Sequence, residues 1–205
     1  MIIYRQATLQ DMRAVAELHN KCFQEYFLTS LGIDMLEKYY TEFRLDSNIF
    51  VLALDDEAED GEKLVGFLMG YYRDTKARAN FESKYKWQLF GKLLKMCLCL
   101  NKDAISRCID KVKSVLTPAK IDAFVPDADF LSIAILPEYR TTRGISGMLI
   151  AECEKIMLAR DDLKVKSCTV STRVDNISCR RCFEKRGWKK LSEKNGSIRY
   201  VHYYS

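Results

Sequence analysis

The stretch PEYRTTRGISGMLI, from Pro137 to Ile150, concentrates residue types that bind phosphate. Its arginines carry positive charge, its threonines and serine offer hydroxyl donors, and Gly144 lets a ligand approach the backbone closely. An apolar run that ends at Leu136 precedes the stretch, and apolar residues at helical spacing follow Gly144. A loop that leads from a strand into a helix presents unpaired N–H groups at the positive end of the helix dipole. The pattern therefore predicts a phosphate cradle, with a solvated turn as the alternative.

The eight cysteines offer a second kind of chemistry. Cys179 and Cys182 form a C-x-x-C pair, a spacing found in redox motifs and zinc sites. No second pair of this kind occurs, and His19 and His202 lie far away along the chain. Most of the cysteines occupy apolar positions of regular segments, where reduced thiols pack as small hydrophobic side chains. We therefore expect free thiols and no metal site.

These candidate residues must be positioned by alternating strands and helices. The expected order is strand, two helices, three strands, helix, strand, helix and strand. The expected strands are 2–4, 49–54, 63–72, 130–136, 165–174 and 197–204, and the expected helices begin near residues 8, 34, 144 and 176. This order indicates an α/β fold, a mixed sheet with helices on its faces. The chain length favours a single domain over residues 1–205.

One segment, residues 76–118, interrupts this order between the third and fourth strands. It holds ten Lys and Arg residues against three acidic residues, so its net charge of +7 exceeds the +5 of the whole chain. Apolar residues at helical spacing predict two helices here, and we expect a basic helical insertion over residues 76–125. Three interpretations stay open: a solvated face packed on the core, a lid that attracts an anionic substrate, or attachment to an acidic membrane surface.

Composition narrows the class of protein further. A formal charge of +5 is modest and does not by itself indicate nucleic-acid binding. The longest apolar runs, such as Leu131–Leu136, are too short to span a bilayer, and strand-like residues rather than a signal peptide follow Met1. We therefore expect a cytoplasmic protein with no nucleic-acid partner.

Three segments resemble the GCN5-related N-acetyltransferase (GNAT) family. SIAILPEYRTTRGISGMLI resembles the family's fourth strand and the R/Q-x-x-G-x-G/A motif that follows it. YRQATLQDMRAVAELH resembles the opening strand and first helix, and NISCRRCFEKRGW resembles N-x-x-A-x-x-F-Y-x-x-x-G-F. The resemblance covers nearly everything except residues 76–118. It implies a mostly antiparallel central sheet with helices on both faces, plus the helical insertion.

The resemblance implies acetyl-CoA as co-substrate, held where the fourth and fifth strands splay into a V, and no metal. Strand backbone would pair with the pantetheine amides, and a backbone N–H would polarise the thioester carbonyl. With Gly144 and Ser146 as the small-residue pair, Thr141 takes the motif's Arg/Gln position, so which arginine meets phosphate stays open. The residues assigned to the cofactor are Ile133, Ile135, Leu136, Arg140, Thr141, Thr142, Arg143, Gly144, Ile145, Ser146, Asn176 and Phe183.

The same resemblance raises the question of which groups move protons. Asp129, near the start of the fourth strand, is the first candidate for the base that deprotonates the amine, and a solvated turn carboxylate is the alternative. Phe183 stands where relatives often carry a tyrosine that protonates the departing thiolate. The thiolate can leave unprotonated, since a thiol of pKa near 8.5 is a fair leaving group. Otherwise the candidates by composition are Cys182, Tyr200, His202 and Tyr203.

The expected activity is transfer of an acetyl group to a primary amine of a small molecule, by direct attack in a ternary complex. An amino sugar or a nucleotide-amino sugar is the candidate acceptor, on a weaker similarity to family members in surface-sugar pathways. Two alternatives stay open. One is a catalytically silent acyl-CoA-binding or scaffold protein, and the other is a membrane-surface or polyanion-binding module that acts through the basic insertion.

Overall fold

The computed structural model describes residues 1–46, 48–58, 61–99, 124–142 and 144–204. Its strands are β1 (Ile2–Gln6), β2 (Phe50–Asp55), β3 (Lys63–Tyr72), β4 (Ala128–Ile135), β5 (Ser167–Arg173), β6 (Lys189–Lys194) and β7 (Ser197–Tyr203). Its helices are α1 (Met12–Cys22), α2 (Phe27–Ser30), α3 (Ile33–Leu45), α4 (Ala77–Lys84), α5 (Lys86–Cys99), α7 (Ile145–Leu158) and α8 (Ile177–Lys185). Short 3-10 turns lie at Leu9–Asp11 and Pro137–Tyr139.

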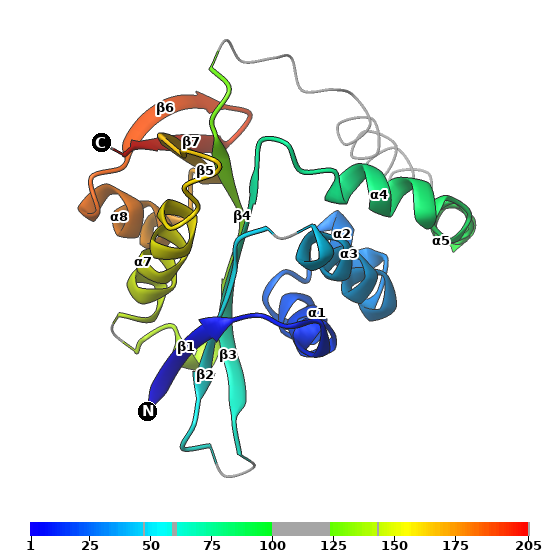
Figure 1. The fold of residues 1–205 in the computed structure, drawn as a ribbon. Coiled ribbons are helices and arrows are strands. Elements are labelled where there is room, and N and C mark those ends of the chain that lie inside the picture. Colours follow the sequence, from blue (N-terminus) through cyan, green and yellow to red (C-terminus); the bar gives the residue numbers. More distant parts are fainter. Residues whose placement is uncertain (47, 59–60, 100–123, 143, 205) are drawn as a thin grey trace.

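The strands form one sheet in the order β1-β2-β3-β4-β5-β7-β6 (Figure 1). Neighbouring strands are antiparallel except β4 and β5, which run parallel. This mixed, mostly antiparallel sheet confirms the expected fold class. The sequence pattern does not predict β6, because KKLSEK has no alternation of apolar residues; the strand forms by pairing with β7 at the edge of the sheet.

Helices cover both faces of the sheet (Figure 1). On one face, α7 and α8 bury Leu149 and Phe183 in a cluster with residues of β3 to β5. On the other face, α1 and α3 bury Val15 and Tyr40 against β2 and β3. Residues Phe50–Leu54 of β2 are buried at every position, as expected for a strand with a helical layer on each side.

The insertion leaves the sheet between β3 and β4, as the sequence predicts (Figure 1). The segment gives two helices before residue 100, α4 and α5, where one was predicted. Phe81 of α4 packs with Leu31 and Met35 in a small separate cluster. The other predicted helix, at residues 103–116, lies outside the described residues. The role of the basic insertion therefore stays a prediction.

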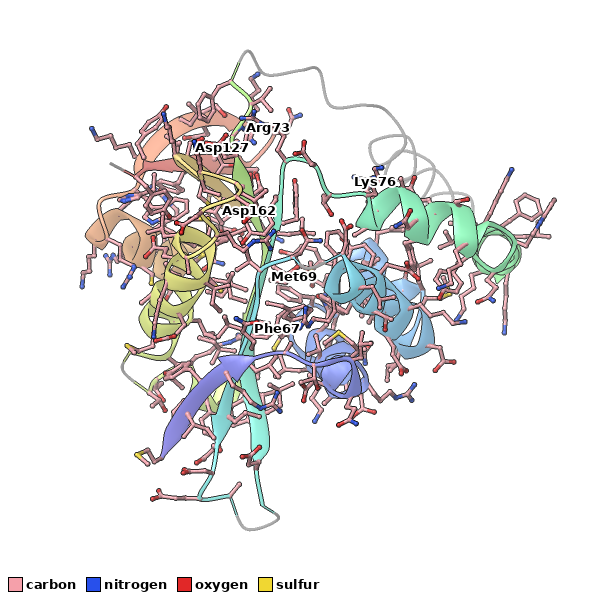
Figure 2. All side chains as sticks on the ribbon, in the orientation of Figure 1. Phe67, Met69, Arg73, Lys76, Asp127 and Asp162 are labelled. Atoms are coloured by element: carbon pink, nitrogen blue, oxygen red, sulfur yellow. The ribbon has the colours of Figure 1, made fainter. Side chains whose placement is uncertain are left out.

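Arg73 and Asp127 close the neck of this insertion (Figure 2). The Arg73 N–H donates to the Asp127 carbonyl at 2.9 Å, and its guanidinium donates to the Val125 carbonyl at 3.0 Å and the Asp127 carboxylate at 2.7 Å. That carboxylate also accepts the N–H groups of Lys166 and Ser167, at 3.0 Å each, at the start of β5. One side chain therefore ties both ends of the insertion to the neighbouring strand.

Within the described residues, no helix is both long enough and apolar enough to cross a bilayer.

Candidate functional site

The parallel strands β4 and β5 separate towards their carboxyl ends. They pair at three positions, of which the last sets Phe130 opposite Val170. β5 then continues against β7 as far as Arg173, while β4 continues against β3 as far as Ile135. A V-shaped opening therefore lies between the two strands.

A β-bulge in β4 marks the point where the V begins. Gly70 of β3 faces Phe130, and the next β3 residue towards the amino end faces Ser132, so Leu131 is the extra residue. A Cβ on Gly70 would lie 2.8 Å from the Phe130 ring and 2.9 Å from the Asp129 carbonyl. Only glycine leaves the bulge undisturbed.

Backbone polar groups of β4 point into the V. The Leu136 N–H donates to the Val65 carbonyl of the β3 side at 2.9 Å. In an antiparallel pair, residues that bond the partner strand alternate with residues whose N–H and C=O groups face away from it. Ile133 and Ile135 therefore direct their backbone groups away from β3, to the side where β5 no longer pairs. An extended ligand with amide groups could pair with this edge.

Two helices begin at the open ends of these strands. α7 begins after Gly144, whose φ of 98° is left-handed, and no described atom lies within 4 Å of the place a Cβ would take. α8 begins after Asn176, whose side chain accepts the Cys179 N–H at 3.2 Å. No side chain of the described residues caps the start of α7. Its free N–H groups and dipole therefore favour an anion.

A cleft of about 870 Å³ extends from the V towards the opposite helices. On the sheet side it is lined by Leu131, Ser132 and Ile133 of β4, and it reaches Asn176 at the start of α8. On the helix side its wall is largely aromatic and aliphatic, and includes Phe23, Tyr26, Phe27, Trp87, Leu89 and Phe90. One continuous space thus joins the α8 start, the bulge and the inserted helix α5.

No protein-family model and no curated protein matches the sequence. Solved structures do match the fold of this chain. PaiA N-acetyltransferase from Thermoplasma acidophilum, in complex with coenzyme A, is 14% identical with a TM-score of 0.58, over 100% of this chain and 99% of that chain. The chain has the GNAT fold. The NatC complex bound to Gag peptide and CoA matches at 11% identity and TM-score 0.61, over 100% and 99%. The ribosomal-protein-S18-alanine N-acetyltransferase from Escherichia coli matches at 11% and 0.56, over 98% and 92%.

Most residues expected in the GNAT phosphate cradle lie around the start of α7. Thr141 and Thr142 are exposed there, Ser146 is half-buried, and Ile145 turns its side chain into the core. Arg143 lies outside the described residues. The hydroxyl groups of this loop are thus placed where the helix start would meet an anion.

Arg140 turns towards β4. Its Nε donates to the Ile135 carbonyl at 3.1 Å, and the Cys22 thiol of α1 donates to the same oxygen at 3.4 Å. The Ile135 carbonyl is therefore already engaged, and the edge available to an extended ligand centres on Ile133. Arg140 holds the loop against the strand end, and its charge stays beside the V.

Leu136 and Phe183 place their side chains in the core, and their assignment to the cofactor stays a prediction. Leu136 is 4% exposed in the cluster under α1 and α3, and its N–H is bonded within the sheet. Phe183 is 0% exposed and packs edge-on against Trp188, with ring centroids 5.0 Å apart. Both side chains hold the layers of the GNAT fold together.

Asp129 is half-buried next to the bulge and does not line the cleft, whereas its neighbour Phe130 does. Its carboxylate accepts the Thr169 hydroxyl and an Arg199 nitrogen at 3.3 Å. Burial raises the pKa of Asp129 to about 6, although Thr169 and Arg199 act to lower it. The group can therefore exchange a proton near neutrality, but a proton from the cleft would need a relay to reach it.

The four residues considered as proton donors have different surroundings. Within the described residues, only Cys182 contacts the cradle, because its thiol donates to the Ser146 hydroxyl at 3.4 Å. Tyr200 is buried, the His202 ring packs on the α8 side of the sheet, and Tyr203 is 57% exposed at the chain end. Cys179 and Cys182 are free thiols, and no group of three metal-binding side chains gathers within the part of the chain described.

Sequence reasoning missed His19 as a site residue. It lies in α1, lines the cleft, and sets its Nδ1 2.6 Å from the Tyr40 hydroxyl. Burial lowers the pKa of His19 to about 4, so the ring is neutral at physiological pH. The only signal in the sequence is a histidine on the apolar side of the first helix, and its partner comes from another helix.

Proposed function

We propose that the protein is an N-acetyltransferase that moves the acetyl group of acetyl-CoA to a primary amine in a ternary complex. The observation that carries this proposal is the V between β4 and β5, with an uncapped helix start on one side and a cleft on the other. Coenzyme A is a pyrophosphate joined to an amide-containing arm, and the V offers a partner for each part. Solved neighbours with coenzyme A bound support the proposal because they share the fold.

The start of α7 would hold the pyrophosphate. Its N–H groups and dipole favour negative charge, and the left-handed Gly144 leaves the approach clear of a side chain. Thr141, Thr142 and Ser146 add hydroxyl donors, and Arg140 adds positive charge. These groups are all ones that bind phosphate.

The β4 edge would hold the pantetheine arm. Ile133 presents a backbone donor and acceptor to the V, and Asn176 stands at the other wall of the same space. An arm paired with Ile133 extends towards the bulge at Leu131. A backbone N–H at the bulge is then available to stabilise negative charge on a carbonyl oxygen.

Acetyl-CoA supplies a thioester whose carbonyl carbon forms a C–N bond with the amine as the C–S bond breaks. The chain's part is to bring the amine through the cleft, to hold the carbonyl at the bulge and to take up the proton that the nitrogen loses. Asp129 lies two residues before Leu131 in the chain and, with a pKa of about 6, serves as the final proton acceptor through a relay. The thiolate can leave unprotonated, because a thiol with a pKa near 8.5 is a fair leaving group.

The direct test is calorimetric titration with acetyl-CoA, followed by release of free thiol in the presence of a panel of primary amines. Binding with turnover of at least one amine is the expected result. Binding without turnover on any amine would instead support the silent acyl-CoA-binding protein, and no binding would overturn the proposal.

A substitution at Gly144 tests the cradle. We expect Gly144→Glu to weaken acetyl-CoA binding by about tenfold or more, because a carboxylate would stand at the helix start meant for phosphate. Gly144→Gln has the same size and the same backbone strain without the charge, so it should retain more affinity. The readout is the dissociation constant of each variant, measured by calorimetry.

Gly196→Glu is the matched control for a carboxylate on a left-handed glycine. Gly196 has a φ of 74° in the turn between β6 and β7, and no described atom lies within 4 Å of its Cβ position. This variant should bind acetyl-CoA as the wild type does. Equal affinity of Gly144→Glu and Gly196→Glu would show that the α7 start is only a turn.

A further inference from the structure

His19 carries a buried polar atom with no partner at the wall of the cleft. The residue is 4% exposed, and its Nδ1 is engaged by Tyr40. Its Nε2 has no hydrogen-bond partner among the described residues. Buried side-chain nitrogens are nearly always paired, so an orphaned one beside a cavity indicates a ligand that completes it.

The imidazole is held in place by its neighbours. Tyr40 is fully buried, and its ring packs edge-on against Phe67 of β3 at 5.4 Å between centroids. Phe23 lies on the other side of His19, with ring centroids 4.7 Å apart. Because Tyr40 fixes Nδ1, Nε2 is the ring atom left for recognition. Nε2 itself is buried, so a ligand that binds it must displace a neighbouring side chain; Phe23, which packs on the ring, lies just beyond the carboxyl end of α1.

The rest of the cleft is suited to apolar groups. Aromatic and aliphatic side chains from the α1–α2 region and from α5 supply most of the helix-side wall. Of the charged side chains in the lining, Arg78 pairs with Glu82 at 3.0 Å and Arg173 pairs with Asp175 at 2.6 Å, while the Lys86 ammonium lies 5.9 Å from the centroid of the Trp87 ring. A sugar would bury hydroxyl groups against this wall without partners, whereas an alkyl or aryl group would lose only water contact.

We propose that the helix-side part of this cleft, opposite the strand edge assigned to the pantetheine arm, is the acceptor subsite for a small primary amine that carries an aromatic or aliphatic group, with the amine N–H donating to Nε2 of His19. The inference rests on the proposed acetyl transfer and narrows its acceptor from primary amines in general to apolar ones. In the complex, Nδ1–H donates to the Tyr40 oxygen, which leaves the lone pair of Nε2 for the amine. His19 is then a substrate-binding residue that orients the nitrogen.

The first test compares acceptors. Thiol release is measured with phenethylamine and hexylamine, and with glucosamine and putrescine as polar counterparts. We expect kcat/KM to be about tenfold or more higher for the apolar amines. Equal or better turnover of glucosamine, or turnover only of peptides with a free amino terminus, would overturn the assignment of the acceptor class.

The second test removes the nitrogen. His19→Phe keeps a ring in the wall but cannot accept the amine N–H, so kcat/KM for phenethylamine should fall by about tenfold while acetyl-CoA affinity stays within about twofold. Leu18→Met is the matched control, since Leu18 is a buried neighbour in α1 at 3% exposure and the change conserves volume. Equal kcat/KM in wild type and His19→Phe would overturn the role of His19.

A third readout does not depend on turnover. The chain has two histidines, so ¹⁵N-histidine spectra contain two imidazole rings, and His19→Phe assigns them. Adding phenethylamine to the protein with coenzyme A should shift the Nε2 signal of His19 and leave it unprotonated. A shift without any acetyl transfer would retain the subsite and reject the enzyme, whereas transfer without a shift would reject the subsite alone.

Discussion

The pKa values of the half-buried Asp129 and the buried His19 move in opposite senses. Burial raises the pKa of Asp129 from 3.8 to about 6 and lowers the pKa of His19 from 6.5 to about 4. For Asp129 the folded state favours the protonated form, so its contribution to stability is lost as pH rises towards 6. For His19 the folded state favours the neutral form, so its contribution is lost as pH falls towards 4. The two dependences oppose each other over nearly the same range.

Substituting each residue should therefore change the pH dependence of the unfolding free energy in opposite directions. The quantity compared is the free energy of unfolding of each variant minus that of wild type. This difference should increase for Asp129→Asn as pH rises from about 4 to about 6, and it should decrease for His19→Phe over the same range. Each full change is on the order of 3 kcal/mol, since one pKa unit corresponds to about 1.4 kcal/mol. Urea denaturation at several pH values measures both.

Subtracting the wild-type free energy of unfolding cancels the contribution of titratable groups that the variant and the wild type share. A flat difference for Asp129→Asn would mean that Arg199 and Thr169 compensate fully for burial, and that the carboxyl titrates as an exposed one. A flat difference for His19→Phe would mean that the imidazole reaches water.

Only part of the candidate site could be predicted from individual residues in the sequence. The cradle could be proposed from the sequence because glycine, hydroxyl and arginine side chains cluster within one short loop, and it stays a prediction. His19 could not be proposed, since its meaning depends on Tyr40 in another helix and on a wall supplied by α5. The burial of Leu136 and Phe183 was equally hidden, because a motif gives order along the chain and not the direction of a side chain.

At the scale of elements, the bulge in β4 depends on a glycine in the neighbouring strand. We expect Gly70→Ala to destabilise the protein by about 1–3 kcal/mol, because its Cβ would lie 2.8 Å from the Phe130 ring and 2.9 Å from the Asp129 carbonyl. Relief of that contact would move β4, so acetyl-CoA affinity should fall as well. Thermal unfolding and calorimetry measure the two effects.

Gly91→Ala is the control for adding a methyl group. Gly91 lies within α5, and no described atom lies within 4 Å of its Cβ position. Alanine is the better helix former, so this variant should be as stable as the wild type or more stable by up to about 1 kcal/mol. If Gly70→Ala behaved in the same way, the bulge would not depend on the glycine.

Element types were predictable where the apolar pattern is strong. The buried run of β2 and the alternation before the cradle indicated strands, and the helices flanking the sheet followed from apolar spacing. The sequence pattern did not predict β6, because its residues are mostly polar and the strand forms through its pairing with β7. It did not predict the bulge either, since the bulge is a property of register between strands and not of either sequence alone.

At the scale of the molecule, the sheet consists of two well-paired parts joined by the short β4–β5 contact of three positions. Asp127 reinforces this contact, because its carboxylate accepts two N–H groups and the hydroxyl of Ser167 at the start of β5. The opening that we assign to the cofactor therefore forms because β4 and β5 pair over only three positions. A small number of polar contacts must hold the two parts together.

Asp127→Ala should destabilise the protein by about 1–3 kcal/mol, since it removes the acceptor for partly buried backbone N–H groups. Asp162→Ala is the control, because Asp162 forms an ion pair with nearby Arg160 and its side chain is 62% exposed. The control should stay within about 0.5 kcal/mol of wild type. Hydrogen exchange at Ser167 and its neighbours should accelerate only in Asp127→Ala, and equal exchange in both variants would contradict this role.

Because Arg73 and Asp127 close the neck of the insertion, the insertion could be replaced as a unit. β3 and β4 keep their register through pairing that ends at Tyr72 and Ala128, and the neck bonds lie immediately beyond. A different segment could therefore be spliced between these points without redesigning the strands that carry the V. Because α5 supplies one wall of the cleft, such an exchange would change which molecules are selected while the donor half is inherited unaltered.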